Sequence, residues 1–82
     1  MTQENRVQVE LLGETFTVKG EGTAAEIQGT GGFLNEQLNY LSGRCPGLNA
    51  KNLALLTAFN LASELLRVRR DYEALAAILD KQ

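Results

Sequence analysis

The chain has 82 residues, a net charge of −2 and no histidine. At this length we expect one domain with a core near the lower limit for independent stability, which small chains often remedy by burying apolar surface in an oligomer. The acidic balance, with a pI near 5.0, argues against a nucleic-acid or membrane partner, because both attract basic patches.

The single cysteine and the N-terminus indicate the compartment. Cys45 has no second cysteine to pair with in the chain, which fits a reducing environment. No apolar run approaches the roughly 20 residues of a membrane span, and residues 1–6 lack the apolar core of a signal peptide. We therefore expect a soluble, cytoplasmic protein.

The first expected element is a β-hairpin. Strands at Arg6–Leu12 and Thr15–Lys19 flank Gly13-Glu14, a Gly-X pair that suits a two-residue type II′ turn. Pairing across that turn gathers the apolar side chains on one face, with these partners: Leu11 opposite Phe16, and Val9 opposite Val18. A lone hairpin is marginal in water, so this face is expected to cover a helix.

A capping box, Thr23 to Glu26, then opens a helix that we expect to run to Ser42, with Gly43 as its stop. Its apolar stripe consists of Ile27, Gly31, Leu34, Leu38 and Leu41. Glycines at 29, 31 and 32 conflict with this assignment, because each costs about 1 kcal/mol in a helix interior. The helix either starts late, near residue 33, or kinks, or lets another backbone approach closely at position 31.

After a turn at Arg44–Leu48, Asn49 is a good N-cap for a last helix that continues to Gln82. Its apolar residues recur at heptad spacing: Ala54, Ala58, Leu61, Leu65, Val68, Tyr72, Leu75 and Leu79. We call this row the seam. A helix of roughly 45–50 Å is longer than so small a domain is wide, so its far end must project or pair with a second chain.

The last helix is expected to have two parts. From Leu53 to Leu66 apolar residues occur on nearly every side, including a second stripe at Leu55, Phe59, Ala62 and Leu66, which predicts burial on all sides. Beyond Arg67 the seam alone stays apolar. We therefore divide the chain into a globular head, 1–66, and a short coiled-coil arm, 67–82, continuous with the same helix.

The seam predicts a homodimer. Its expected interface consists of Ala58, Phe59, Leu61, Leu65, Val68, Tyr72, Leu75 and Leu79. With Ala58 at an a position, Glu64 falls at g and Arg69 at the following e, the spacing of an interhelical ion pair in a parallel coiled coil. Such exposed pairs contribute less than about 1 kcal/mol to stability, so this spacing favours a parallel arrangement of the helices without fixing it.

Motifs that could carry chemistry are weak. The segment Gly20–Ala25 resembles a dinucleotide fingerprint, but that motif needs a β-α-β unit, and Gly29–Gly32 lacks the lysine of a phosphate loop. Without histidine the commonest general base and metal ligand are missing, and Cys45 has no base or resolving cysteine. We expect no enzyme, no catalytic residues, no cofactor and no metal.

One basic cluster is present, at Arg67, Arg69 and Arg70. Acidic residues interleave with it, so a solvated, internally paired helix face explains it better than a nucleic-acid contact.

Two segments carry a resemblance to a known family. Residues 7–20 are similar to the opening hairpin of ZapA, a family of bacterial cell-division proteins that associate with the tubulin-like FtsZ. Pro46–Asn49 followed by Leu53–Leu66 resembles the family's "P-x-L … L-A-L-N-I-A-x-E-L" helix. The resemblance implies an α+β fold of the ββαα type, a hairpin followed by two helices, dimeric through the long last helix.

The resemblance also implies a function. It implies a non-enzymatic cell-division accessory protein that binds FtsZ polymers at the division site and bridges or bundles protofilaments. Exposed charges at Glu14, Lys51 and Arg67 are the candidate partner contacts. Typical members are expected to continue beyond Gln82, and in longer members two dimers join through an extended coil, so dimer and tetramer both stay open. The alternative function is a generic cytosolic dimerisation or adaptor module with another protein partner.

Overall fold

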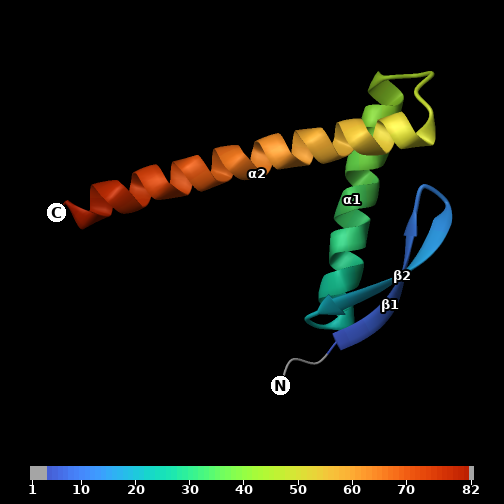
Figure 1. Cartoon of the computed structure of the whole chain (residues 1–82), viewed down its shortest axis with the longest axis horizontal. Helices are drawn as coiled ribbons and strands as arrows, with labels where there is room; N and C mark the ends of the chain where they lie inside the picture. Colours follow the sequence, from blue (N-terminus) through green and yellow to red (C-terminus); the bar gives the residue numbers. More distant parts are fainter. Residues whose placement is uncertain (1–3, 82) are drawn as a thin grey trace.

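A computed structural model describes residues 4–81 as a hairpin followed by two helices, which confirms the expected α+β fold. The elements are β1 (Glu4–Leu11), β2 (Glu14–Glu21), α1 (Ala24–Arg44) and α2 (Ala50–Asp80). The molecule measures 50 × 40 × 15 Å, because α2 crosses α1 and then runs away from the rest of the chain (Figure 1). Predictions for residues 1–3 and 82 lie outside the described residues.

The turn of the hairpin lies one residue earlier than predicted. Its central residues are Leu12 and Gly13, with φ values of 54° and 78°, as in a type I′ turn, whose twist matches that of paired strands. Leu11 therefore pairs with Glu14 instead of Phe16. Moving the turn by one residue shifts the pairing by two, so the predicted register is wrong but the predicted apolar face is retained. The apolar pairs on that face are Val9 with Phe16 and Val7 with Val18.

The apolar face of the hairpin packs on α1, as predicted. Val7, Val9 and Ile27 are buried together, and Leu11 and Val18 pack against them. With five side chains, this cluster removes little apolar surface from water.

Polar side chains of α1 also bind the backbone of β1. The Gln28 amide donates to the carbonyl oxygen of Gln8 at 2.6 Å. The Asn35 amide donates to the carbonyl of Glu10, and its Oδ1 accepts the N–H of Leu12 at 3.3 Å. The carbonyls of Gln8 and Glu10 point away from β2, since every second residue of an antiparallel strand directs its backbone groups away from its partner strand. The two amides therefore cover the outer edge of β1.

Helix α1 is continuous through its glycines. The Thr23 Oγ1 accepts the N–H of Glu26 at 3.1 Å and so caps the helix as predicted. Gly31 is buried, and a Cβ at this position would lie 2.4 Å from Cγ1 of Val9. The helix starts at Ala24 and not near residue 33, and the close approach at Gly31 is made by the Val9 side chain and not, as predicted, by a backbone.

The first helix ends later than predicted. It passes through Gly43 and ends at Arg44, with Cys45 as its C-cap. The left-handed glycine of this turn is Gly47, with a φ of 95°, so the chain reverses after the proline. Asn49 then caps α2 as predicted, because its side chain accepts the N–H of residue 52 at 2.8 Å.

Helix α2 packs on α1 along one side. In the described part of the helix, the buried residues are Leu53 and Thr57. The Thr57 side chain is 1% exposed, and its hydroxyl donates to the carbonyl of Leu53 at 2.8 Å, so this buried polar group is satisfied within its own helix. The prediction that the first half of α2 is buried on all sides is wrong for a single chain, because one chain supplies a neighbour on one side.

Candidate protein-interaction surface

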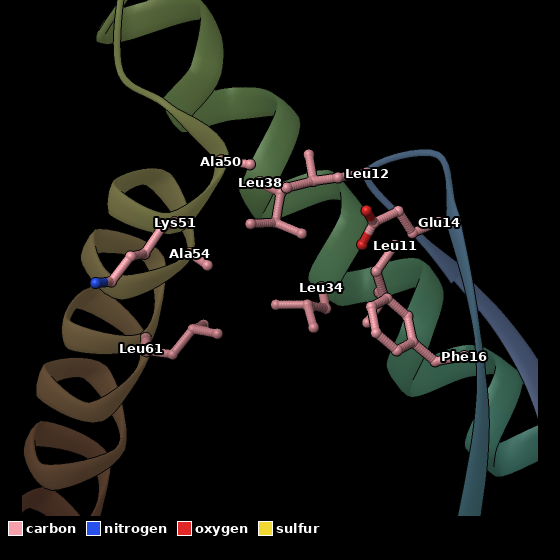
Figure 2. A pocket seen from close by; sticks show the side chains of 11 residues that line it. Leu11, Leu12, Glu14, Phe16, Leu34, Leu38, Ala50, Lys51, Ala54 and Leu61 are labelled. Carbon is pink, nitrogen blue, oxygen red and sulfur yellow. The ribbon is translucent and has the colours of Figure 1, made fainter.

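An apolar groove of about 490 Å³ opens between α2, α1 and the hairpin. Figure 2 shows Leu34 and Leu38 of α1 and Leu61 of α2 projecting into the space between the two helices. The hairpin closes another side with Phe16 and the residues at its tip. The complete lining is Leu11, Leu12, Glu14, Phe16, Leu34, Leu38, Ala50, Lys51, Ala54, Ala58 and Leu61.

The groove was not predicted as a unit, because it depends on how α2 crosses α1. Its side along α2 includes Ala50, Ala54 and Ala58, small residues at a spacing of four. The spacing of these alanines is the sequence feature that could have indicated the groove, because small side chains four residues apart form a shallow strip along one face of a helix.

The seam continues from the groove along the projecting part of α2. Its residues Ala54, Ala58 and Leu61 line the groove, and its later members lie on the projecting part of the helix. The large side chains of this later part are 57–72% exposed: Leu65, Val68, Tyr72, Leu75 and Leu79. A row of exposed apolar side chains on this scale marks an interaction surface.

The second stripe is a separate exposed surface of α2. Its large residues are Leu55, Phe59 and Leu66, and Phe59 is 70% exposed. Phe59 follows the buried Thr57 by two positions, and two residues correspond to about 200° around a helix. The second stripe therefore faces away from α1.

The three charged candidates fall at two places. Glu14 and Lys51 both line the groove, where Figure 2 shows Lys51 pointing away from its interior. Arg67 lies further along α2 and forms an ion pair with Glu64, one turn earlier in the helix. Both partners of this pair are largely exposed, so the pair contributes little to stability.

The glycine-containing segments considered as ligand-binding motifs belong to ordinary secondary-structure elements. Gly29–Gly32 lies within α1, and Gly20 belongs to β2, which pairs antiparallel with β1 and not within a β-α-β unit. Across residues 4–81, no group of three or more Cys, Asp or Glu side chains is placed to hold a metal ion. Within the same part of the chain, no helix has the length and apolar character needed to cross a membrane.

The exposed area of a single chain is large for its mass. The chain exposes 6778 Å², whereas a compact monomer of 9.0 kDa is expected to expose about 4,850 Å². The excess of about 1,900 Å² is more than twice what one partner buries in an interface of standard size.

Comparison with known proteins points to one family. The family model "Cell division protein ZapA" matches residues 7–82. The chain is 36% identical over 84 residues to a cell division protein ZapA of Geobacillus thermodenitrificans, with 100% of the chain and 92% of the relative covered. It is 33% identical over 70 residues to the ZapA of Shouchella clausii, covering 85% of the chain and 90% of the relative.

A solved structure has the same fold. It is a ZapA mutant dimer from Geobacillus stearothermophilus, with a TM-score of 0.79 and 30% sequence identity, covering 98% of this chain and 93% of that one. The expectation that typical members extend well beyond this chain does not hold for these relatives, since the chain spans at least nine-tenths of each.

Proposed function

Because the chain belongs to the ZapA family of cell-division proteins, we propose that it forms a homodimer that binds FtsZ polymers at the division site. The dimer bridges or bundles protofilaments without a catalytic step. The observation that carries this proposal is the seam, whose large side chains are exposed along a projecting helix in a chain whose structural relative is a dimer.

The proposed dimer pairs the α2 helices along the seam. Its interface consists of Ala58, Phe59, Leu61, Leu65, Val68, Tyr72, Leu75 and Leu79. In support, the large members of this set other than Leu61 are more than half exposed in the single chain, and burying apolar surface contributes about 25 cal/mol per Å².

The proposed link between filaments follows from symmetry. A two-fold dimer presents two copies of any filament-binding surface, and two weak sites on one particle bind a polymer more tightly than either does alone. We propose Glu14, Lys51 and Arg67 as contacts with FtsZ. All three are exposed in the single chain, and Arg67 lies off the seam.

Co-sedimentation with assembled FtsZ tests the proposal. We expect the wild-type protein to pellet with the polymers and to bundle them, as seen by light scattering. Leu65→Asp places a charge in the seam, so it should abolish bundling, whereas Ser63→Asp places the same charge on the opposite side of α2 and should not. Arg67→Glu should reduce pelleting while the dimer mass stays unchanged.

Two outcomes would contradict the proposal. A wild-type protein that neither pellets with FtsZ nor bundles it is not an FtsZ-binding member of the family, and the adaptor function with another protein partner would replace the proposal. If Leu65→Asp bundled FtsZ as well as the wild type, bridging would not depend on the seam.

A further inference from the structure

The two outer edges of the hairpin differ in what covers them. On β1, the side-chain amides of Gln28 and Asn35 donate to carbonyls that point away from β2. On β2, every second residue directs its N–H and C=O away from β1, and these residues include Thr15, Thr17 and Lys19. Within residues 4–81, none of their outward backbone groups has a hydrogen-bond partner. The outer edge of β2 is therefore open.

This open edge is long and regular. Strand β2 runs for 8 residues in unbroken register with β1, and it contains no proline. Helix α1 packs along β1, so Thr15, Thr17 and Lys19 stay exposed. Sheets commonly protect an edge with a bulge, a proline or a covering segment. Without these, β2 can accept an extended chain as a further strand.

Two cations lie side by side on the polar face of the hairpin. Arg6 and Lys19 are directly opposite each other, in a pair that does not exchange backbone hydrogen bonds and so brings its side chains close together. Like charges in such a pair repel. Both side chains are exposed, and within residues 6–81 neither forms an ion pair, even with Glu21 two positions along β2. The pair therefore attracts a carboxylate from outside the chain.

An apolar cavity of about 200 Å³ lies under the opposite face of the hairpin. Its lining includes Val18 of β2 with Ile27 and Leu34 of α1. At about 100° per residue, Ile27 and Leu34 lie roughly 40–60° to one side of Gly31, and Asn35 lies about 40° to the other. Since Asn35 binds the outer edge of β1, the cavity lies toward β2. It provides space for apolar side chains of a strand added there.

We propose that an extended acidic segment of a protein partner adds to the outer edge of β2 as a third, antiparallel strand. Its carboxylate lies opposite Lys19 and close to Arg6, and the apolar residues before and after the carboxylate point toward the cavity beside Val18. A second copy of β2 does not meet this need, because an antiparallel pair centred in the strand sets a threonine opposite Lys19. The inference goes beyond the proposed function, since it requires neither the seam nor FtsZ.

Titration of the isotope-labelled full chain with synthetic peptides, followed by NMR, tests the proposal. The probe is the acetylated and amidated peptide Thr-Val-Asp-Val-Thr-Leu-Ser. We expect it to shift the amide signals of Thr15, Thr17 and Lys19 and to slow their hydrogen exchange. The same peptide with lysine in place of aspartate should bind at least ten times more weakly.

Two methylated peptides test whether the contact is a backbone ladder. In an antiparallel pair, the aspartate N–H donates to the carbonyl of Lys19, whereas the N–H of the valine that follows points away from β2. A methyl group on the aspartate nitrogen should therefore abolish binding, and one on the valine nitrogen should not.

Lys19→Glu should weaken binding of the aspartate peptide at least tenfold. The variant should keep its fold, because it sets an acidic residue opposite Arg6. Lys81→Glu makes the same charge change at the exposed end of the chain and is the control. If Lys19→Glu does not fold, the comparison of peptides on the wild type still decides the proposal.

Three results would overturn the proposal: equal binding of the aspartate and lysine peptides, equal binding of the two methylated peptides, or slow exchange at Thr15, Thr17 and Lys19 without peptide. The last result would mean that a second copy already covers the edge. The experiment contains no FtsZ, so the pelleting assay decides the proposed function separately.

Discussion

Single residues explain how so small a head holds its hairpin in place. Gly31 is the position where α1 comes closest to the strand, because Cγ1 of Val9 occupies the space that a Cβ would need. Gly29 and Gly32 meet nothing within 4 Å of the same hypothetical atom. Three glycines that look equivalent in the sequence therefore have different roles, and the difference follows from the packing of the hairpin.

We predict that Gly31→Ala destabilises the protein while Gly32→Ala stabilises it. The first change forces the β-branched Val9 or its strand to move, at a cost of about 1–3 kcal/mol. The second adds a better helix former in open space, for a gain of up to about 1 kcal/mol. Urea unfolding at a fixed protein concentration measures both free energies. A Gly31→Ala protein as stable as Gly32→Ala would show that the close contact with Val9 is absent.

At the scale of elements, the alternation of apolar residues predicted the apolar face of the hairpin but not its register. Side chains alternate between the two faces of a strand, so a shift of the pairing by two residues leaves the same side chains on the apolar face. The alternation therefore does not distinguish the two positions of the turn. The choice between turns depended on Leu12, which adopts a left-handed conformation that is uncommon for leucine. Its N–H is bound by Asn35, a residue 23 positions away, and no local pattern contains that interaction.

Asn35→Ala tests how α1 holds the hairpin. The change removes the acceptor for the Leu12 N–H and the donor to the Glu10 carbonyl, so we expect a loss of about 0.5–1.5 kcal/mol per hydrogen bond. Amide hydrogen exchange should become faster at Leu12, measured by NMR. Asn39→Ala, on an exposed part of the same helix, is the control. Unchanged protection of Leu12 in the Asn35 variant would show that the turn holds its own conformation.

The long helix was the most predictable element and the groove the least predictable. Heptad spacing identified the seam, and Asn49 marked the start of α2. The expectation of burial on all sides from Leu53 to Leu66 failed for a single chain, because α1 covers the Leu53 face and leaves Phe59 exposed. The groove needs the hairpin, α1 and α2 together, and their relative placement is a property of the tertiary structure that periodicity in one segment does not contain.

At the scale of the whole molecule, the buried apolar core is small. Its buried hydrophobic residues, among those described, are Val7, Val9, Ile27, Leu38 and Leu53. Most of the apolar surface of α2 lies outside this core. A chain of this kind gains stability by association, since a partner that binds the folded state favours folding by mass action.

The molecular mass in solution, measured by analytical ultracentrifugation across a wide concentration range, tests the central claim that the seam is a self-association surface. We predict a species of twice the 9.0 kDa chain mass for the wild type and for Ser63→Asp. Leu65→Asp should sediment as a monomer, because it places an unpaired charge in the apolar interface. A wild-type mass of one chain at every concentration, or a Leu65→Asp mass equal to the wild type, would contradict the account.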